Sequence, residues 1–224
     1  MQKTKIEWTD YVWNPIKGMC PNDCWYCYAI KIYERFNLPQ ELSLDGRAPI
    51  LSNKKPRKIF VCSTMEMFHP DIPKEWRDRI FKIIEQDYNQ KHTFQILTKF
   101  PQNIDRSMPN NVWLGVTVDN VHDFWRAREL ERKNAKIKFI SFEPLLSKIW
   151  SEHCYVKGMF KKSLLIDWVI VGRLTGYGKK HDPPREWVEH IVKTCYYSKI
   201  PIFIKSNLKE IWEEPLMQEF PCVT

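Results

Sequence analysis

The chain has 224 residues, of which 43% are hydrophobic and 28% are charged, and its formal net charge is +8. No apolar stretch reaches membrane-spanning length and the N-terminal segment lacks the apolar run of a secretory signal, so we expect a cytoplasmic protein with no membrane partner. The length suits one sizeable core, and residues 1–224 are expected to form a single domain.

The positive charge is compatible with an anionic partner such as nucleic acid. Basic residues gather in three short segments, 54–58, 157–162 and 178–185. Lysine-rich segments often form only a solvated surface, so charge alone leaves nucleic-acid contact open.

Short apolar runs rich in β-formers recur along the chain. They predict strands at 10–15, 58–68, 93–99, 112–118, 137–146, 167–172 and 200–206. Continuous apolar runs of this kind are typical of parallel strands that are covered on both faces.

Helical patterns lie between several of these runs, at 71–86, 120–133 and 182–197. Asp71 and Asp182 are predicted to cap the first and third helices. The predicted apolar stripes consist of Trp76, Ile80 and Ile84, of Val121, Trp125 and 128–130, and of Trp187, Ile191 and Cys195.

The alternation of strands and helices predicts an α/β fold with right-handed crossovers. Six to seven parallel strands favour a partial or near-complete (β/α) barrel, with a flavodoxin-like doubly wound sheet as the alternative. The gap between the strands at 93–99 and 112–118 is too short for a full helix, so the repeat is expected to fail there.

Polar residues follow or end every predicted strand after the first. Parallel barrels place their chemistry at the carboxyl ends of the strands. The set predicts the lining of an active site and comprises Ser63, Thr64, Glu66, Thr98, Lys99, Thr117, Asp119, Ser141, Glu143, Arg173, Lys205 and Ser206.

Three cysteines, Cys20, Cys24 and Cys27, lie within the loop 18–29, directly after the first predicted strand. An odd total of seven cysteines favours reduced, metal-binding thiols over disulfides. Zinc sites normally close with four ligands, and the nearest fourth candidates, Cys62 and His69, have no finger-like spacing. Three thiolates on an iron–sulfur cluster would leave one iron with open coordination. The remaining cysteines, Cys62, Cys154, Cys195 and Cys222, are interpreted as buried or incidental thiols.

The C-x3-C-x2-C spacing, with Tyr26 before the third cysteine, resembles the radical S-adenosylmethionine superfamily. The resemblance implies that Cys20, Cys24 and Cys27 hold a [4Fe-4S] cluster whose fourth iron binds S-adenosylmethionine. It implies cleavage of that cofactor to a 5′-deoxyadenosyl radical that abstracts hydrogen from a substrate. It also implies a partial or full (β/α) barrel with the cluster loop after the first strand.

The same resemblance assigns further residues to S-adenosylmethionine. Ser63, Thr64 and Glu66 would meet its amino group, although the glycine pair often found there is missing in this chain. A capping or salt-bridging role for Glu66 is the alternative. The other implied cofactor-binding residues are Tyr26 in the cysteine loop and Thr117, Ser141, Glu143 and Gly172 toward the ribose or adenine.

A closer resemblance is carried by "TKIEWTDYVWNPIKGMC", "MEMFHPDIP", "FQILTK", "WLGVTV", "FISFEPLL" and "DWVIVG". Together they resemble a phage-associated family of radical-SAM-type proteins of unassigned function. Members usually continue the last of these runs with a glycine pair, glutamate, serine and glycine. Here residues 172–176 are GRLTG, so Arg173 and Leu174 replace the second glycine and the glutamate. The cysteine loop also resembles that of spore photoproduct lyase, a DNA-repair enzyme.

These observations lead to three functional hypotheses. The first is a radical enzyme that acts on nucleic acid, in DNA repair or base modification, with a flavodoxin- or ferredoxin-like electron donor and a partner protein. The second is a radical enzyme that acts on a peptide or small molecule, whose carboxylate or phosphate would pair with Lys99, Arg173 or Lys205. The third is a non-catalytic metal-binding module that binds nucleic acid. Cys62 and Tyr177 are candidates by position to quench a substrate radical, and His69 is a candidate for acid–base work.

Overall fold

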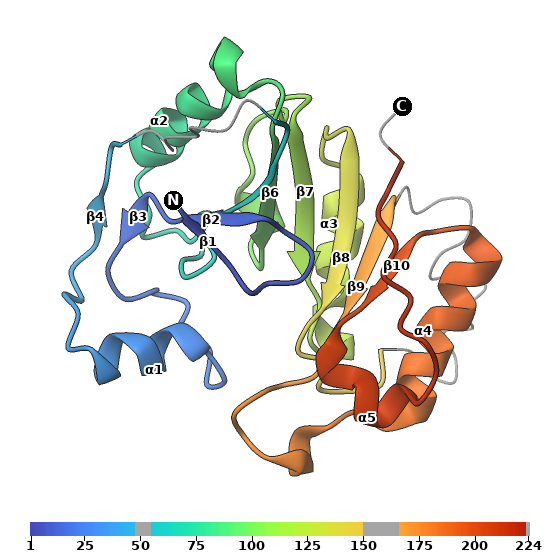
Figure 1. The fold of residues 1–224 in the computed structure, drawn as a ribbon. Coiled ribbons are helices and arrows are strands. Elements are labelled where there is room, and N and C mark those ends of the chain that lie inside the picture. Colours follow the sequence, from blue (N-terminus) through green and yellow to red (C-terminus); the bar gives the residue numbers. More distant parts are fainter. Residues whose placement is uncertain (48–54, 150–165, 223–224) are drawn as a thin grey trace. The chain divides into compact units, whose positions relative to one another are not determined.

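A computed structural model describes residues 1–47, 55–149 and 166–222 (Figure 1). The chain divides into two compact units, Met1–Trp113 and Leu114–Thr224. The expected single domain over residues 1–224 stays a prediction. The basic segment 157–162 and Cys154 lie outside the described residues.

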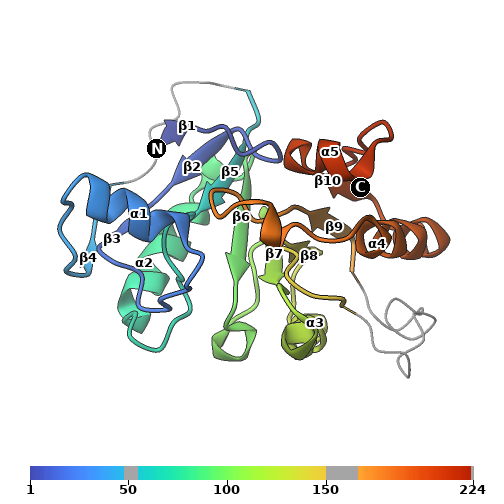
Figure 2. The same ribbon diagram turned by 90° about the horizontal axis from the view of Figure 1, so that it is seen from below.

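The N-terminal unit is built on a sheet in which most neighbouring strands are parallel. β1 (Gln2–Lys3) pairs antiparallel with β2 (Tyr11–Trp13), β2 pairs parallel with β5 (Lys58–Val61), and β5 pairs parallel with β6 (Thr93–Thr98). A separate antiparallel pair consists of β3 (Ile16–Lys17) and β4 (Ser43–Leu44). The helices are α1 (Tyr28–Arg35), α2 (Lys74–Ile84), and the 3₁₀ turns η1 (Asp87–Asn89) and η2 (Pro101–Asn103). Figure 2 shows α1 beside β3 and β4.

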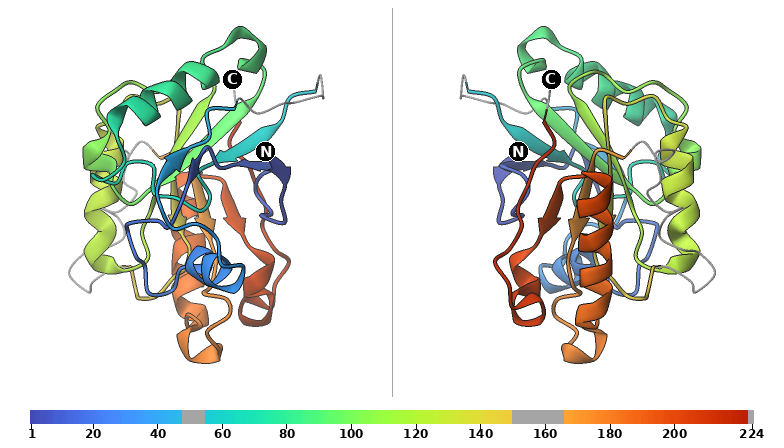
Figure 3. Two further views of the ribbon diagram at one scale, coloured as in Figure 1. Left: turned by 90° about the vertical axis from the view of Figure 1, so that its left-hand side faces the viewer. Right: turned by 90° about the vertical axis from the view of Figure 1, so that its right-hand side faces the viewer.

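The C-terminal unit contains three adjacent parallel strands, β8 (Ile137–Phe142), β9 (Trp168–Val171) and β10 (Ile202–Ile204). β7 (Val112–Thr117) crosses the division between the two units. The helices are η3 (Val121–Phe124), α3 (Trp125–Glu131), η4 (Lys179–His181), α4 (Arg185–Ser198), η5 (Ser206–Leu208) and α5 (Lys209–Trp212). The segment after α5 returns antiparallel to β10, with Gln218 opposite Phe203 (Figure 3).

These pairings confirm an α/β fold with mostly parallel strands. Each predicted strand contains an observed one, and the connection from β6 to β7 holds only the short η2 turn, as expected. The predicted strand at 58–68 ends at Val61, because Cys62 has a φ of 57° and its carbonyl accepts the N–H of Met65 at 3.1 Å. The chain therefore turns at Cys62, several residues earlier than expected. Within the described ranges, no helix is long and apolar enough to cross a membrane.

The two predicted aspartate caps are wrong. Pro73 and Pro184 occupy the positions before α2 and α4, and neither helix has a side-chain cap. Asp71 and Asp182 therefore lie two residues too early to reach the first-turn N–H groups. Asp182 instead pairs with Arg173, at 2.9 Å between the carboxylate and the guanidinium.

The predicted apolar stripes are only partly correct. Ile80 and Ile84 of α2 are buried, as are Ile191 and Cys195 of α4, but each tryptophan of these two stripes is half-buried. The middle stripe is correct at Leu130, which is buried, but wrong at Trp125, which is 43% exposed, and Ala127 is buried in its place. The α-helix begins only at Trp125, and the preceding 3₁₀ turn has a different period, which shifts the inward face.

Large side chains pack closely on one face of the C-terminal sheet. The rings of Phe139 and Trp168, which are directly opposed on β8 and β9, have centroids 5.4 Å apart. Gly115 on β7 lies against Phe139, and a Cβ atom at Gly115 would approach the ring to 2.4 Å. Because Phe139 is fully buried, its ring has no free space into which to move.

We therefore expect Gly115→Ala to destabilise the protein by about 1–3 kcal/mol, the usual cost of overpacking a core. Urea denaturation followed by circular dichroism would measure this loss. Gly46→Ala is the matched control, because its Cβ would meet only the end of the flexible Arg79 side chain, at 3.0 Å. The control should change stability by less than about 0.5 kcal/mol. Equal losses in the two variants would contradict this account.

Candidate cofactor site at the cysteine loop

The cysteine loop begins at Gly18, directly after β3, so this short strand separates the loop from the first predicted strand. Gly18 has a φ of 104°, and a Cβ atom there would lie 2.4 Å from the carbonyl oxygen of Glu41. Only glycine fits this conformation and this contact. At the other end of the loop, Cys27 donates its N–H to the carbonyl of Cys24 at 2.8 Å and directly precedes α1.

Two of the three cysteine sulfurs accept hydrogen bonds. The Glu66 N–H lies 3.2 Å from Cys20 Sγ, and the side-chain amide of Asn22 lies 2.9 Å from Cys24 Sγ. Donors of this kind favour the thiolate form that metals bind. Burial raises the pKa of the Cys20 thiol to about 11, and the main-chain N–H groups of Asn22 and Glu66 oppose this rise.

The donor chemistry of the loop therefore fits a soft metal or an iron–sulfur cluster. Among residues 1–47, 55–149 and 166–222, no three His, Cys, Asp or Glu side chains are already arranged to hold a metal ion. The assignment of Cys20, Cys24 and Cys27 as ligands stays a prediction.

Glu66 connects this loop to two strands. It lies in the turn after β5, is 7% exposed, and its carboxylate accepts hydrogen bonds from the Thr98 hydroxyl at 2.5 Å and from the N–H groups of Lys99 at 2.7 Å and Phe68 at 3.1 Å. Burial raises the pKa of the Glu66 carboxyl, and these donors oppose the rise. Because its own N–H reaches Cys20, Glu66 joins the cysteine loop to the end of β6.

Lys99 makes a second connection to the loop. Its ammonium donates to the Tyr26 hydroxyl at 2.5 Å and lies 5.2 Å from the centre of the Tyr26 ring. Tyr28, just beyond Cys27, donates its hydroxyl to the carbonyl of Ser63 at 2.7 Å. The loop is thus attached to the carboxyl ends of β5 and β6 on both sides of Cys27.

The turn after β5 holds the other predicted residues of this unit. Cys62 is 5% exposed, and burial raises the pKa of its thiol to about 12, which agrees with the interpretation as a core residue. The Ser63 hydroxyl donates to Asn14 at 3.2 Å, and Thr64 is half-buried. His69 accepts the Asp71 N–H at 3.2 Å.

The C-terminal unit holds a second group of predicted residues. Glu143, Gly172 and Lys205 directly follow β8, β9 and β10, and the carboxylate of Glu143 pairs with the ammonium of Lys205. A Cβ atom at Gly172 would lie 3.0 Å from the carboxyl carbon of Glu143, so the missing side chain leaves room for this pair. Ser141, two residues before Glu143, is buried, and its hydroxyl has no hydrogen-bond partner within the described residues.

Arg173, which replaces the second glycine of the pattern in the phage-associated family, holds the loop that follows β9 through several hydrogen bonds. Its guanidinium binds both carboxylate oxygens of Asp182 at 2.9 Å and the carbonyl of Asn207, while the Asn207 amide donates to the Arg173 carbonyl at 3.0 Å. Tyr177 lies half-buried between two glycines of this loop, and Thr117 lies buried at the end of β7.

The sequence did not identify several of these participants, among them Gly18, Tyr28, Asp182 as an ion-pair partner, and Asn207. Gly18 carries a usable signal, because a glycine directly before a cysteine-rich loop often marks a tight turn. Tyr28 and Asn207 carry none, because their partners are main-chain atoms distant in sequence.

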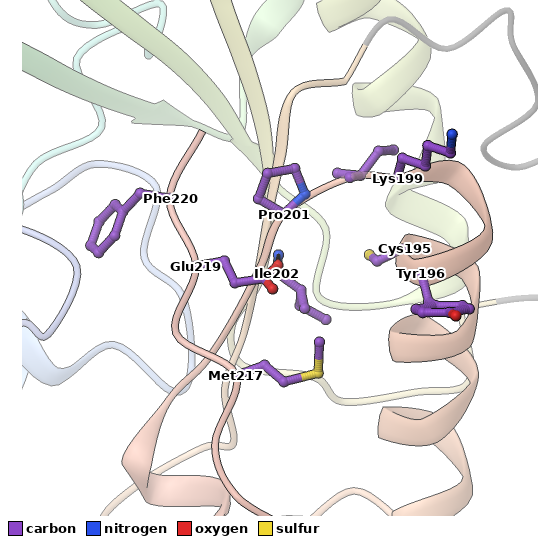
Figure 4. Close-up of a pocket in the computed structure, with 9 residues that line it drawn as sticks. Cys195, Tyr196, Lys199, Pro201, Ile202, Met217, Glu219 and Phe220 are labelled. Atoms are coloured by element: carbon purple, nitrogen blue, oxygen red, sulfur yellow. Dashed lines mark hydrogen bonds between the residues drawn. The ribbon is translucent and has the colours of Figure 1, made fainter. Parts of the chain in front are cut away.

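A pocket of about 440 Å³ lies elsewhere in the C-terminal unit, between α4, the start of β10 and the returning C-terminal segment (Figure 4). Its lining includes Cys195, Tyr196, Lys199, Met217 and Phe220 and contains none of the predicted site residues. It opens at the amino end of β10, whereas parallel sheets carry their chemistry at the carboxyl ends. It is therefore separate from the candidate site.

Fold and site together define an α/β protein with a cysteine-rich loop attached to the carboxyl ends of parallel strands. The model of one family, described as a protein of unknown function (DUF5131), matches residues 3–214, and the chain belongs to this family. No curated protein and no solved structure matches the chain.

Thr98→Val tests the Glu66 network. The change keeps the side-chain shape but removes one donor to a buried carboxylate and the acceptor of the Phe100 N–H at 2.9 Å, and we expect a loss of about 1–3 kcal/mol in unfolding free energy. Thr93→Val is the control, because the Thr93 hydroxyl on the same strand makes no hydrogen bond within the described residues. Thermal and urea denaturation would compare the two variants, and an unchanged Thr98→Val protein would refute the proposed importance of this contact.

Proposed function

We propose that this protein is a radical S-adenosylmethionine enzyme that acts on nucleic acid in the cytoplasm. The observation that carries the proposal is the C-x3-C-x2-C loop, attached through Cys20–Glu66 and Tyr26–Lys99 to the carboxyl ends of β5 and β6. Cofactor chemistry in parallel α/β folds is concentrated at these strand ends. A partial (β/α) barrel of the radical-SAM type is the finer fold that goes with this proposal.

Cys20, Cys24 and Cys27 would hold the [4Fe-4S] cluster. When bound, the cluster would supply the electron that cleaves S-adenosylmethionine and so generates the 5′-deoxyadenosyl radical. A flavodoxin- or ferredoxin-like donor would reduce the protein, and a partner protein would help to hold a large substrate.

Within the N-terminal unit, the chain's own residues fix the loop. Glu66 has three hydrogen-bond donors on its carboxylate, so its main task is to position Cys20 and the end of β6. Ser63 and Thr64 remain the proposed contacts to the amino group of S-adenosylmethionine. Tyr26 is held by Lys99 next to Cys27, which orients its ring beside the cysteine ligands.

Within the C-terminal unit, Thr117, Ser141, Glu143 and Gly172 remain the proposed contacts to the ribose and adenine. The buried Ser141 hydroxyl, unsatisfied within the described residues, supports a polar ligand at this strand end.

The alternative of a peptide or small-molecule substrate relied on Lys99, Arg173 and Lys205 as anion-binding groups. Each of these cations already has a partner: Tyr26, Asp182 and Glu143, respectively. A substrate carboxylate would have to displace these partners, which weakens that alternative. The non-catalytic module requires a fourth protein ligand and leaves S-adenosylmethionine intact, so it is tested by the same experiment.

The protein should be reconstituted anaerobically with iron and sulfide, reduced with dithionite and incubated with S-adenosylmethionine. We expect cluster absorbance and formation of 5′-deoxyadenosine, measured by chromatography. Cys24→Ala should lose the cluster absorbance, because only two of the three ligands remain. The control Cys222→Ala removes an exposed thiol outside the loop and should retain both signals. A colourless, zinc-loaded protein that leaves S-adenosylmethionine intact would refute the proposal.

A further inference from the structure

Exposed apolar side chains concentrate beside the cysteine loop. Among the described residues of the N-terminal unit, seven large apolar side chains are exposed, and five of them lie between residues 25 and 38. The three largest exposures in this segment belong to Phe36 at 61%, Trp25 at 57% and Tyr28 at 52%. Such a local concentration of exposed aromatic rings marks an interaction surface.

Helix periodicity places two of these rings, those of Tyr28 and Phe36, on one face together with positive charge, whereas Trp25 lies in the loop before α1. Tyr28, Ile32 and Phe36 are spaced four residues apart, and Lys31 and Arg35 fall between them on the same side of α1. The acidic Glu34 is exposed as well and lies three residues after Lys31, at the edge of this face. The face therefore carries two cations and has one carboxylate at its edge.

The side of α1 next to Phe36, which carries Ala29 and Tyr33, packs into the protein. Ala29 is 3% exposed, and the Tyr33 hydroxyl accepts the N–H of Gly18 at 3.1 Å. These contacts fix which face of the helix is turned outward.

Three of the outward groups are already held in place. The Tyr28 hydroxyl is bonded to the Ser63 carbonyl, Trp25 packs edge-on against Tyr26 with centroids 5.3 Å apart, and the Arg35 guanidinium lies 5.4 Å from the centre of the Phe36 ring. Rings that are ordered before binding lose little conformational entropy when a ligand stacks on them.

We propose that this face binds single-stranded nucleic acid, and we name it the α1 platform: Trp25, Tyr28, Lys31, Ile32, Arg35 and Phe36. Bases stack on Trp25, Tyr28 and Phe36, and phosphates pair with Lys31 and Arg35. Stacking requires unpaired bases, so the ligand is a single strand. The inference rests on the proposed function and specifies the form of its nucleic-acid substrate.

Nucleic acid fits this face better than an acidic protein does. Three aromatic rings interleaved with two cations match the alternation of bases and phosphates, and the chain carries a net charge of +8. A protein interface would also use the rings, but lysine is depleted in such interfaces.

The test uses the full-length protein and a fluorescein-labelled single-stranded DNA of mixed sequence, with anisotropy measured against salt. The unlabelled single strand and its duplex serve as competitors. We expect Phe36→Ala and Trp25→Ala each to weaken binding about tenfold, equivalent to about 1.4 kcal/mol. Tyr88→Ala is the matched control, because Tyr88 is 55% exposed in the same unit but lies outside the α1 platform, and it should leave affinity unchanged. Lys31→Gln and Arg35→Gln should each reduce the slope of log affinity against log salt by about 0.7.

Several results would overturn the α1 platform as the binding surface. The first is an equal effect of Phe36→Ala and Tyr88→Ala on DNA affinity, and the second is tighter binding of the duplex than of the single strand. The third is an unchanged DNA affinity of the platform variants combined with slower reduction by flavodoxin, which would mark the face as a protein-docking surface. Phe36 is exposed, so unchanged thermal unfolding of Phe36→Ala separates a binding defect from a folding defect. The binding measurement needs neither the cluster nor S-adenosylmethionine. A failure of cofactor cleavage therefore contradicts only the proposed function, and a failure of DNA binding with intact cleavage contradicts only the platform.

Discussion

The arrangement of the N-terminal unit depends on the buried carboxylate of Glu66. A carboxylate removed from water is costly unless hydrogen bonds replace its hydration, and here Thr98, Lys99 and Phe68 supply them. These donors come from the end of β6 and from the turn after β5, so satisfying the carboxylate fixes the two chain segments together. The Glu66 N–H extends the same constraint to Cys20. Glu66, which was expected to contact a cofactor, thus connects the cysteine loop to the ends of β5 and β6 in the structure.

In the C-terminal unit, a carboxylate at a strand end is paired with an ammonium group. Glu143 and Lys205, at the ends of strands that flank β9, meet beside Gly172, which has no side chain to separate them. Arg173 stands where the resembled family has a glycine, and its guanidinium and main chain bind Asp182 and Asn207. The departure from that pattern therefore has a structural consequence: it braces the loop that follows β9.

The parallel strands were predictable because continuous apolar runs identify them regardless of their neighbours, whereas the two-residue antiparallel strands β1, β3 and β4 were not predicted. The helix caps were not. An aspartate near a helix start is a good signal, but Pro73 and Pro184 take the position next to each helix, and Asp182 finds a stronger partner in Arg173. The stripe through Trp125 failed for a related reason, because a 3₁₀ turn before α3 changes the helical period.

The sequence by itself determined the α/β class, the positions of the parallel strands along the chain and the position of three thiols in one loop, because these follow from local composition and spacing. Only the tertiary structure decided what those thiols contact. The bonds from Glu66 to Cys20 and from Lys99 to Tyr26 join residues 46 and 73 positions apart, and no local pattern encodes such pairs. It also decided that the rings of Trp25, Tyr28 and Phe36 face outward, because burial depends on which side of α1 the rest of the unit covers.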